Sequence, residues 1–252
     1  MNNQPKTYAD VAKTIDHSLL QPFLTETEMA AGCHLARLYD VASVCIKPAF
    51  VPLARDILAG STVAPSTTIG FPHGGHRTDV KVFESERAMD DGATELDMVV
   101  NIGKVLGNDW DYVNADIKAV LDACHQHGAI LKVIFENDYL ETAHKIKLCE
   151  ICSALNVDFV KTSTGYGYVK QADGKFLTKG ATMEDLQLMR KHTAPHVQIK
   201  AAGGVRNLKD MLAAIEAGAT RIGATATVAI LEDQGLAVDG SQLKGKDDKG
   251  GY

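Results

Sequence analysis

The 252-residue sequence has no hydrophobic run that approaches the ~20 apolar residues that a membrane-spanning helix needs. Residues 1–13 are largely polar, so they lack the apolar centre of a secretory signal. We therefore expect a cytoplasmic protein with no membrane association.

The sequence also lacks clusters of positive charge. It has 26 lysines and arginines against 32 aspartates and glutamates, a formal net charge of -6, and charges of both signs are interspersed. Nucleic-acid-binding domains instead gather Lys and Arg on one face. We expect no nucleic-acid partner.

Cysteines are few, and their number, five, is odd. Without a secretory signal this favours reduced thiols over a disulfide framework. Cys149 and Cys152 form a CxxC inside a helical pattern, but no second pair completes a zinc site. The segment His73-Gly74-Gly75-His76 is interpreted as a loop, because no HExxH motif or suitably spaced carboxylate accompanies it. We expect neither a metal nor any other cofactor.

What the sequence does contain is a regular alternation of strand-like runs and helical stretches, repeating about every 30 residues, the length of one βα unit. This predicts an α/β fold, a single-domain (β/α)8 TIM barrel over residues 1–231, and a flexible C-terminal tail over residues 232–252. An open doubly wound sheet is the alternative, but no GxGxxG motif follows an early strand. Strands are expected at 14–18, 41–46, 63–70, 94–100, 130–136, 158–161, 196–201 and 220–224. Helices are expected at 25–39, 51–59, 81–91, 111–127, 141–155, 183–192 and 208–217.

Charged side chains are expected inside this barrel. Because side chains alternate across a strand, packing the apolar face on the helices turns Asp97, Lys132, Lys161 and Lys200 inward. Such an interior is normally apolar, so these charges require desolvation and must be paired. They form either an ion-pair network that fixes strand register or a site in which neighbouring cations keep one lysine amine neutral and nucleophilic near pH 7.

Three glycine-containing loops follow the last three expected strands: Ser163-Thr164-Gly165, Gly203-Gly204-Val205-Arg206 and Gly223-Ala224-Thr225. At these positions (β/α)8 barrels commonly bind a phosphate through backbone N–H groups. A single such loop also serves as an ordinary turn, but three on neighbouring strands favour a phosphorylated substrate.

A set of motifs, in order between about residues 13 and 231, resembles the deoxyribose-phosphate aldolase family. That family consists of class I aldolases on a (β/α)8 barrel, which interconvert 2-deoxyribose 5-phosphate with glyceraldehyde 3-phosphate and acetaldehyde. The motifs are Ile15-Asp16-His17-Ser18-Leu19-Leu20, Gly70-Phe71-Pro72-His73-Gly74, Glu95-Leu96-Asp97-Met98-Val99-Val100-Asn101-Ile102-Gly103, Leu131-Lys132-Val133-Ile134, Phe159 through Gly165, and Lys200-Ala201-Ala202-Gly203-Gly204-Val205-Arg206.

The resemblance implies a role for each matching residue. Lys161 matches the lysine that forms the Schiff base, Lys200 the second lysine whose charge lowers its pKa, and Asp97 the carboxylate that moves protons with a water. Lys132 and Asp16 match the supporting network. Residues at substrate- and phosphate-binding positions are Ser18, Cys45, Thr164, Gly165, Gly203, Gly204, Arg206, Gly223 and Thr225.

Four positions depart from the family pattern. Ser18 replaces a threonine and keeps the hydroxyl, whereas Tyr166 stands where some members have a phosphate-binding lysine. Thr225-Ala226 replaces a pair of serines, and the segment 167–180 is longer than expected. The last residue, Tyr252, matches a C-terminal tyrosine that assists proton transfer in some similar aldolases; a frayed end is the alternative.

The resemblance implies a small phosphorylated sugar as the partner and an enzyme that forms an imine at Lys161. A homo-oligomer is expected, with a dimer as the first choice. A phosphosugar isomerase would use Asp97 and another acid without an imine, and a sugar-phosphate sensor would bind without cleavage. The presence of Lys161, Lys200 and Asp97 together favours the aldolase.

Overall fold

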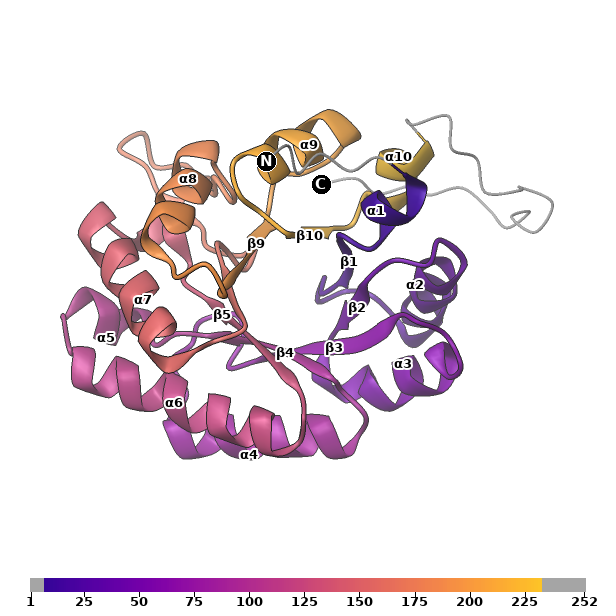
Figure 1. The fold of residues 1–252 in the computed structure, drawn as a ribbon, viewed down its shortest axis with the longest axis horizontal. Helices are drawn as coiled ribbons and strands as arrows, with labels where there is room; N and C mark the ends of the chain where they lie inside the picture. The colour runs from indigo at the N-terminus through magenta and orange to yellow at the C-terminus, as the bar shows by residue number, and fades with distance from the viewer. Residues whose placement is uncertain (1–6, 233–252) are drawn as a thin grey trace.

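A closed barrel of eight parallel strands is the framework of the protein, as the sequence predicts (Figure 1). The computed structural model describes residues 7–232. Around the barrel the strands follow the order β1-β10-β9-β6-β5-β4-β3-β2. They are β1 Ile15–Leu19, β2 Ser43–Ile46, β3 Ala64–Ile69, β4 Glu95–Val99, β5 Ile130–Ile134, β6 Phe159–Lys161, β9 Gln198–Ala202 and β10 Arg221–Ala224.

Helices surround the barrel, and all seven of the expected ones form. The largest change in a helix boundary is at α4, which begins at Thr78 instead of residue 81, with Asp79 in the first turn where a negative charge is favourable. The predicted tail and Tyr252 lie outside the described residues, apart from Glu232, which ends α10. The helices are α1 Tyr8–Ala12, α2 Glu26–Leu38, η1 Pro48–Phe50, α3 Val51–Leu58, α4 Thr78–Asp90, α5 Ile102–Leu106, α6 Trp110–Gln126, η2 Asn137–Tyr139, α7 Thr142–Leu155, α8 Met183–His192, α9 Leu208–Glu216 and α10 Thr227–Glu232.

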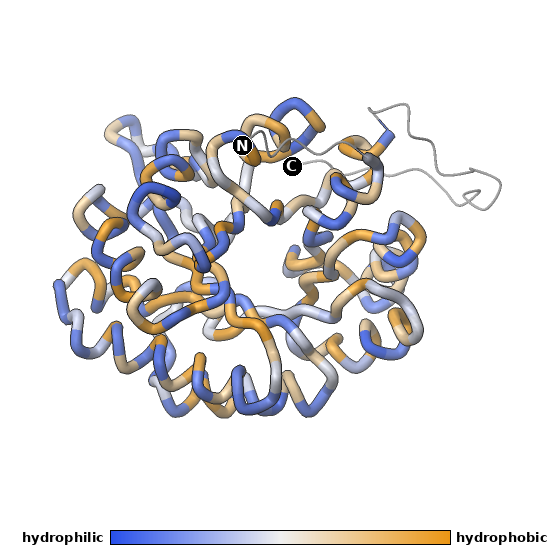
Figure 2. The backbone as a smooth tube through the Cα atoms, viewed as in Figure 1, coloured by the Kyte–Doolittle hydropathy of each residue, from blue (hydrophilic) through white to orange (hydrophobic). Residues whose placement is uncertain are grey.

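The apolar core lies between the strands and one face of each helix. In α6, buried residues recur at Val113, Ile117, Val120, Leu121 and Cys124, a spacing of three or four that lines one side of a helix. The outward-facing strand residues meet this layer, and Figure 2 shows apolar and polar segments alternating around the helical ring. The burial pattern therefore leaves the opposite strand faces to fill the barrel interior.

The segment His73-Gly74-Gly75-His76 is a loop, as expected. At Gly74 a Cβ atom would lie 1.8 Å from the Val100 carbonyl oxygen, and φ is +66°, so only glycine fits there. Both histidines are exposed. Within residues 7–232 no three His, Cys, Asp or Glu side chains gather as a metal site would require, and no helix there has the length and apolarity to span a membrane.

The long segment after β6 contains a small hairpin that the sequence pattern did not predict. Strands β7 Val169–Lys170 and β8 Phe176–Leu177 pair antiparallel, separate from the barrel. A turn with Gly174 at φ +84° joins them. Two-residue strands are too short to show an alternating pattern, so only the unusual length of the segment was visible in the sequence.

One buried ion pair joins two helices to the end of a strand. Lys81 Nζ of α4 lies 2.6 Å from Asp116 Oδ2 of α6 and donates to the Val99 carbonyl at 2.9 Å. Thr78 Oγ1 donates to the other Asp116 oxygen at 2.7 Å. Because both charged side chains are fully buried, each one depends on the other for compensation.

We predict that Lys81→Met lowers the free energy of unfolding by about 3–5 kcal/mol, because it leaves the Asp116 carboxylate buried without a cation. Adding Asp116→Leu should recover part of this loss. The matched control, Asp122→Ala, breaks the half-exposed Lys118–Asp122 pair and should change stability by less than about 1 kcal/mol. Urea unfolding measures all three; a loss from Lys81→Met as small as the control's would contradict the prediction.

Candidate active site

The inward-facing residues of six strands form one cluster of buried charges inside the barrel. The parallel register brings them to neighbouring heights: Asp97 pairs with Lys132, and Lys200 pairs with both Lys161 and Arg221. We call this set the interior charge cluster. Its members are Asp16 of β1, Glu95 and Asp97 of β4, Lys132 of β5, Lys161 of β6, Lys200 of β9 and Arg221 of β10.

Asp97 is the centre of the cluster and contacts three lysines. Its Oδ2 accepts hydrogen bonds from Lys161 Nζ and Lys200 Nζ, both at 2.7 Å, and its Oδ1 accepts one from Lys132 Nζ at 2.9 Å. Burial alone would raise the pKa of this carboxyl, but the three ammonium groups outweigh burial and hold it well below its usual value. The four residues that strand alternation predicted to converge therefore do so, and Asp97 is ionised.

The other two carboxylates of the cluster, Asp16 and Glu95, contact Lys132, Lys200 and Arg221. Asp16 Oδ2 forms an ion pair with Lys200 Nζ at 2.6 Å, and Asp16 Oδ1 accepts hydrogen bonds from Arg221 and from the Ser43 hydroxyl, both at 2.6 Å. Glu95 lies 2.6 Å from Lys132 Nζ and 3.1 Å from Arg221. Asp16 thus contacts three of the four cations of the cluster, and its supporting role in catalysis stays a prediction.

Arg221, Glu95 and Ser43 are members of this network that the sequence reasoning did not assign. The alternation that selected Asp97 also places Glu95 on the inward face, and the same rule applied to β10 would have turned Arg221 inward. Ser43 lies opposite Asp16 in the β1–β2 register. Strand alternation is therefore the sequence signal for Glu95 and Arg221, and the position of Ser43 follows from strand register.

The cluster contains four basic side chains but three carboxylates, so one positive charge lacks compensation. Lys132 contacts all three carboxylates, and Lys200 and Arg221 each contact two. Lys161 contacts Asp97 only, and it shares that oxygen with Lys200. Lys161 is therefore the group whose proton can be lost with the smallest electrostatic penalty.

The pKa shifts agree with this count. Burial, strengthened by the charge of Lys200, lowers the pKa of the Lys161 ammonium in spite of Asp97. Burial acts on Lys200 and Lys132 in the same direction, but their carboxylate partners outweigh it and raise both pKa values. A lysine with a lowered pKa next to a permanently charged lysine is the arrangement that activates an amine as a nucleophile.

Cys45 and Ser18 lie beside the cluster on neighbouring strands, in register with each other. The Cys45 thiol is 3.9 Å from Asp97 Oδ2, and burial raises its pKa, so it remains a thiol. Ser18 is half-buried. The resemblance implies that both line the substrate pocket, and this stays a prediction.

The three glycine loops lie side by side, because β6, β9 and β10 are adjacent in the barrel. Gly165, Gly203 and Gly204 have φ values of +87°, +86° and +89°. Residues other than glycine rarely adopt this backbone conformation. At Gly223 a Cβ would lie 3.4 Å from Lys200 Cε. Arg206 and Thr225 are exposed at the same end.

Thr164 does not present its hydroxyl to the open end of the barrel. It is buried, and both its N–H and its hydroxyl donate to the Glu136 carboxylate. Glu136 follows β5 with φ +59° and ψ +64°, a left-handed conformation that strains a non-glycine residue by roughly 1–2 kcal/mol.

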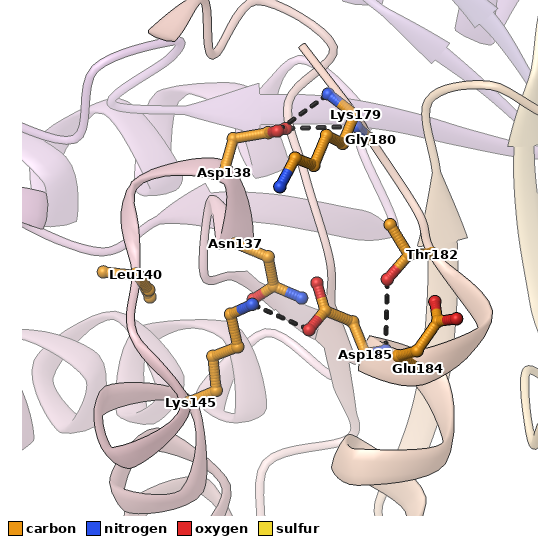
Figure 3. Close-up of a pocket in the computed structure, with 9 residues that line it drawn as sticks. All are labelled: Asn137, Asp138, Leu140, Lys145, Lys179, Gly180, Thr182, Glu184 and Asp185. Carbon is orange, nitrogen blue, oxygen red and sulfur yellow. Dashed lines mark hydrogen bonds and ion pairs between the residues drawn. The ribbon is translucent and has the colours of Figure 1, made fainter. Parts of the chain in front are cut away.

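The two departures near β6 have structural consequences. The Tyr166 ring packs edge-on against Phe71 of the loop after β3, with ring centroids 5.6 Å apart. The far end of the hairpin segment is held by Asp138, whose carboxylate accepts from Thr178 Oγ1 and from the N–H groups of Lys179 and Gly180 (Figure 3).

A cavity of about 410 Å³ lies beside this anchor, between the loops after β5 and β6. Figure 3 shows Lys145 of α7 paired with Asp185 of α8 across it, at 2.7 Å. None of its lining residues belongs to the interior charge cluster. This cavity is therefore separate from the interior charge cluster.

Comparison with known proteins identifies the family. The sequence model of the DeoC/LacD family aldolases matches residues 10–238. A deoxyribose-phosphate aldolase from Rhodopirellula baltica is 54% identical over 224 residues, 89% of each chain, and one from Thermococcus gammatolerans is 46% identical over 88% of this chain and 96% of its own. The solved structure of deoxyribose phosphate aldolase from Aeropyrum pernix, described as a unique tetramer, superposes with a TM-score of 0.80 at 28% identity, covering 92% of this chain and 94% of the other. The chain belongs to the DeoC/LacD family of aldolases.

Proposed function

We propose that this protein is a class I aldolase that reversibly cleaves 2-deoxy-D-ribose 5-phosphate to D-glyceraldehyde 3-phosphate and acetaldehyde, with Lys161 forming the Schiff base. The observation that carries the proposal is the unequal pairing of the four buried cations, which leaves Lys161 as the amine that most readily loses its proton. Relatives at 46–54% identity bear the name of this activity.

In this mechanism the neutral Lys161 amine attacks C1 of the open-chain sugar phosphate, and loss of water gives a protonated imine. A base removes the proton of the C3 hydroxyl, the C2–C3 bond breaks, and its electrons flow into the imine to give an enamine. Carbon C3 leaves as the aldehyde of glyceraldehyde 3-phosphate. Protonation of the enamine at C2 and hydrolysis then release acetaldehyde and the free amine.

The neighbours of Lys161 have distinct parts in this scheme. Asp97 is ionised and lies 2.7 Å from Lys161 Nζ, which supports a role in moving protons through a water. Lys200 keeps its charge and lowers the pKa of Lys161. Lys132 holds Asp97 in position, and Asp16 holds Lys200. Cys45 lines the pocket as a neutral thiol.

The substrate phosphate is assigned to the loops that follow β6, β9 and β10. The backbone N–H groups of Gly165, Gly203, Gly204 and Gly223 are the expected donors, with Ser18, Arg206 and Thr225 around them. Thr164 belongs to the first of these loops. Holding the phosphate fixes C1 relative to Lys161, and such orientation is a large part of the catalytic effect.

We also propose that the chain acts as a homo-oligomer in the cytoplasm, with a dimer as the expected state. The Aeropyrum pernix aldolase is described as a tetramer, which supports association within the family. Exposed apolar side chains such as Val80, Phe83 and Leu106 provide surface for it. All five cysteines are free thiols, in keeping with a reducing compartment.

Borohydride added with acetaldehyde should label the protein irreversibly at Lys161, because reduction traps the imine. Peptide mapping identifies the labelled residue, and Lys161→Met should abolish both the label and the release of acetaldehyde from 2-deoxyribose 5-phosphate. Labelling of Lys200 or Lys132 in the unmodified protein would contradict the assignment of the nucleophile.

Lys200→Met should raise the pKa of Lys161, since it removes a nearby positive charge and frees Asp97 Oδ2 for Lys161 alone. The amine reacts only when neutral, so the acid limb of the pH profile of kcat/KM should move to higher pH and activity near pH 7 should fall. Lys147→Met, which removes a half-exposed cation on α7, is the control and should leave the profile unchanged. An acid limb that stays in place or moves to lower pH in Lys200→Met would show that Lys200 does not tune Lys161.

A further inference from the structure

Glu136 combines three features that are unusual in one residue. It is buried, its backbone has the left-handed conformation, and it lies two residues after the end of β5, next to the strand that carries Lys161. The ladder continues past the strand ends, because Asn137 N–H donates to the Thr162 carbonyl at 2.9 Å. Strained conformations of non-glycine residues that persist next to a reactive group often have a functional reason.

The carboxylate of Glu136 organises the turn that follows Lys161. Thr164 N–H lies 3.2 and 3.3 Å from its two oxygens, and the Thr164 hydroxyl donates to Oε2. The same hydroxyl accepts from Tyr166 N–H at 2.9 Å, so Tyr166, Thr164 and Glu136 form a continuous chain of hydrogen bonds. At Gly167 a Cβ would lie 2.6 Å from Glu136 Cδ, so the turn closes directly on the carboxylate.

This chain of hydrogen bonds engages the N–H groups on either side of Gly165 and leaves that of Gly165 itself free. The Gly165 N–H donates to no acceptor among residues 7–232, and the φ of Gly165 is +87°. A free N–H held between two fixed ones in a glycine turn is suited to an anion.

We propose that Glu136 is a positioning residue that fixes the Thr164–Gly167 turn so that the Gly165 N–H meets the substrate phosphate. Thr164 then acts through this turn and does not contact the phosphate with its hydroxyl. The inference rests on the proposed function and deepens it, because it assigns the specificity for a phosphorylated sugar to a carboxylate that cannot itself bind phosphate.

The experiment compares kcat and KM for 2-deoxyribose 5-phosphate and for 2-deoxyribose, which lacks the phosphate. Glu136→Gln replaces an acceptor oxygen by an NH2 group that faces the Thr164 donors, and Thr164→Val removes the hydroxyl at nearly constant shape. Each should raise KM for the phosphorylated sugar roughly tenfold or more, the effect of losing a hydrogen bond to a charged group. The kcat/KM for 2-deoxyribose should change less than about twofold, and Thr164→Ser should restore the phosphorylated sugar's KM.

Glu136→Gly separates the carboxylate from the strained backbone. Glycine adopts the left-handed conformation without strain, so this variant should still lose the preference for the phosphorylated sugar. Glu141→Gln, an exposed carboxylate in the same loop, is the matched control and should leave both substrates unaffected.

Equal losses of kcat with both sugars in Glu136→Gln would overturn the proposal, because they would indicate a part in the chemical steps. Equal changes of KM, or full phosphate preference in Glu136→Gly, would overturn it in favour of a purely structural role. Trapping of acetaldehyde on Lys161 with borohydride should proceed normally in every variant. Failure of that reaction in the unmodified protein would instead reject the proposed function.

Discussion

The structure depends on one buried carboxylate, Asp97, that is shared by three lysines. Each lysine comes from a different strand, so the hydrogen bonds of Asp97 connect β4 with β5, β6 and β9 across the barrel interior. An interior of this kind gains little from apolar contacts, and taking its charges out of water is costly unless nearly every one is compensated. Asp16 and Glu95 provide that compensation: Asp16 pairs with Lys200 and Arg221, and Glu95 pairs with Lys132.

The pairing of cations with carboxylates that stabilises the interior also distinguishes Lys161, the proposed nucleophile, from the other three cations. If Lys132, Lys200 or Arg221 lost its proton, at least two ion pairs with carboxylates would weaken. Deprotonation of Lys161 weakens only its ion pair with Asp97, and Asp97 Oδ2 still has Lys200 as a partner. With Lys161 neutral, three carboxylates face three cations. The stability of the barrel interior and the nucleophilicity of Lys161 therefore have a common electrostatic origin, and neither requires a residue outside the interior charge cluster.

The sequence was sufficient for the barrel and for the central part of this network, because both follow from the backbone. Side chains alternate with a period of two whatever their neighbours are, and this places Asp97, Lys132, Lys161 and Lys200 together once the barrel is assumed. Arg221 was overlooked although the same rule covers it. The direction of the Thr164 hydroxyl could not be predicted, because it depends on a left-handed turn at Glu136, and no glycine marks that turn in the sequence. The hairpin after Gly167 escaped for a similar reason, since its strands have only two residues each.

Side chains at the open end of the barrel are positioned by different constraints from those in its interior. The interior charges are fixed by strand register, but the phosphate-side donors are located on loops, where conformation depends on individual contacts such as Glu136 with Thr164 or Phe71 with Tyr166. Lys161 and Gly165 are four residues apart in the same segment, so the proposed reactive amine and the proposed first phosphate donor share one short piece of backbone. A small error in that turn would change the distance between the phosphate and the carbon that Lys161 attacks, and misplacement of a bound substrate by about 1 Å can reduce rates 10²-fold. In the proposed mechanism, the buried carboxylate of Glu136 therefore serves to make this turn as rigid as the strand that precedes it.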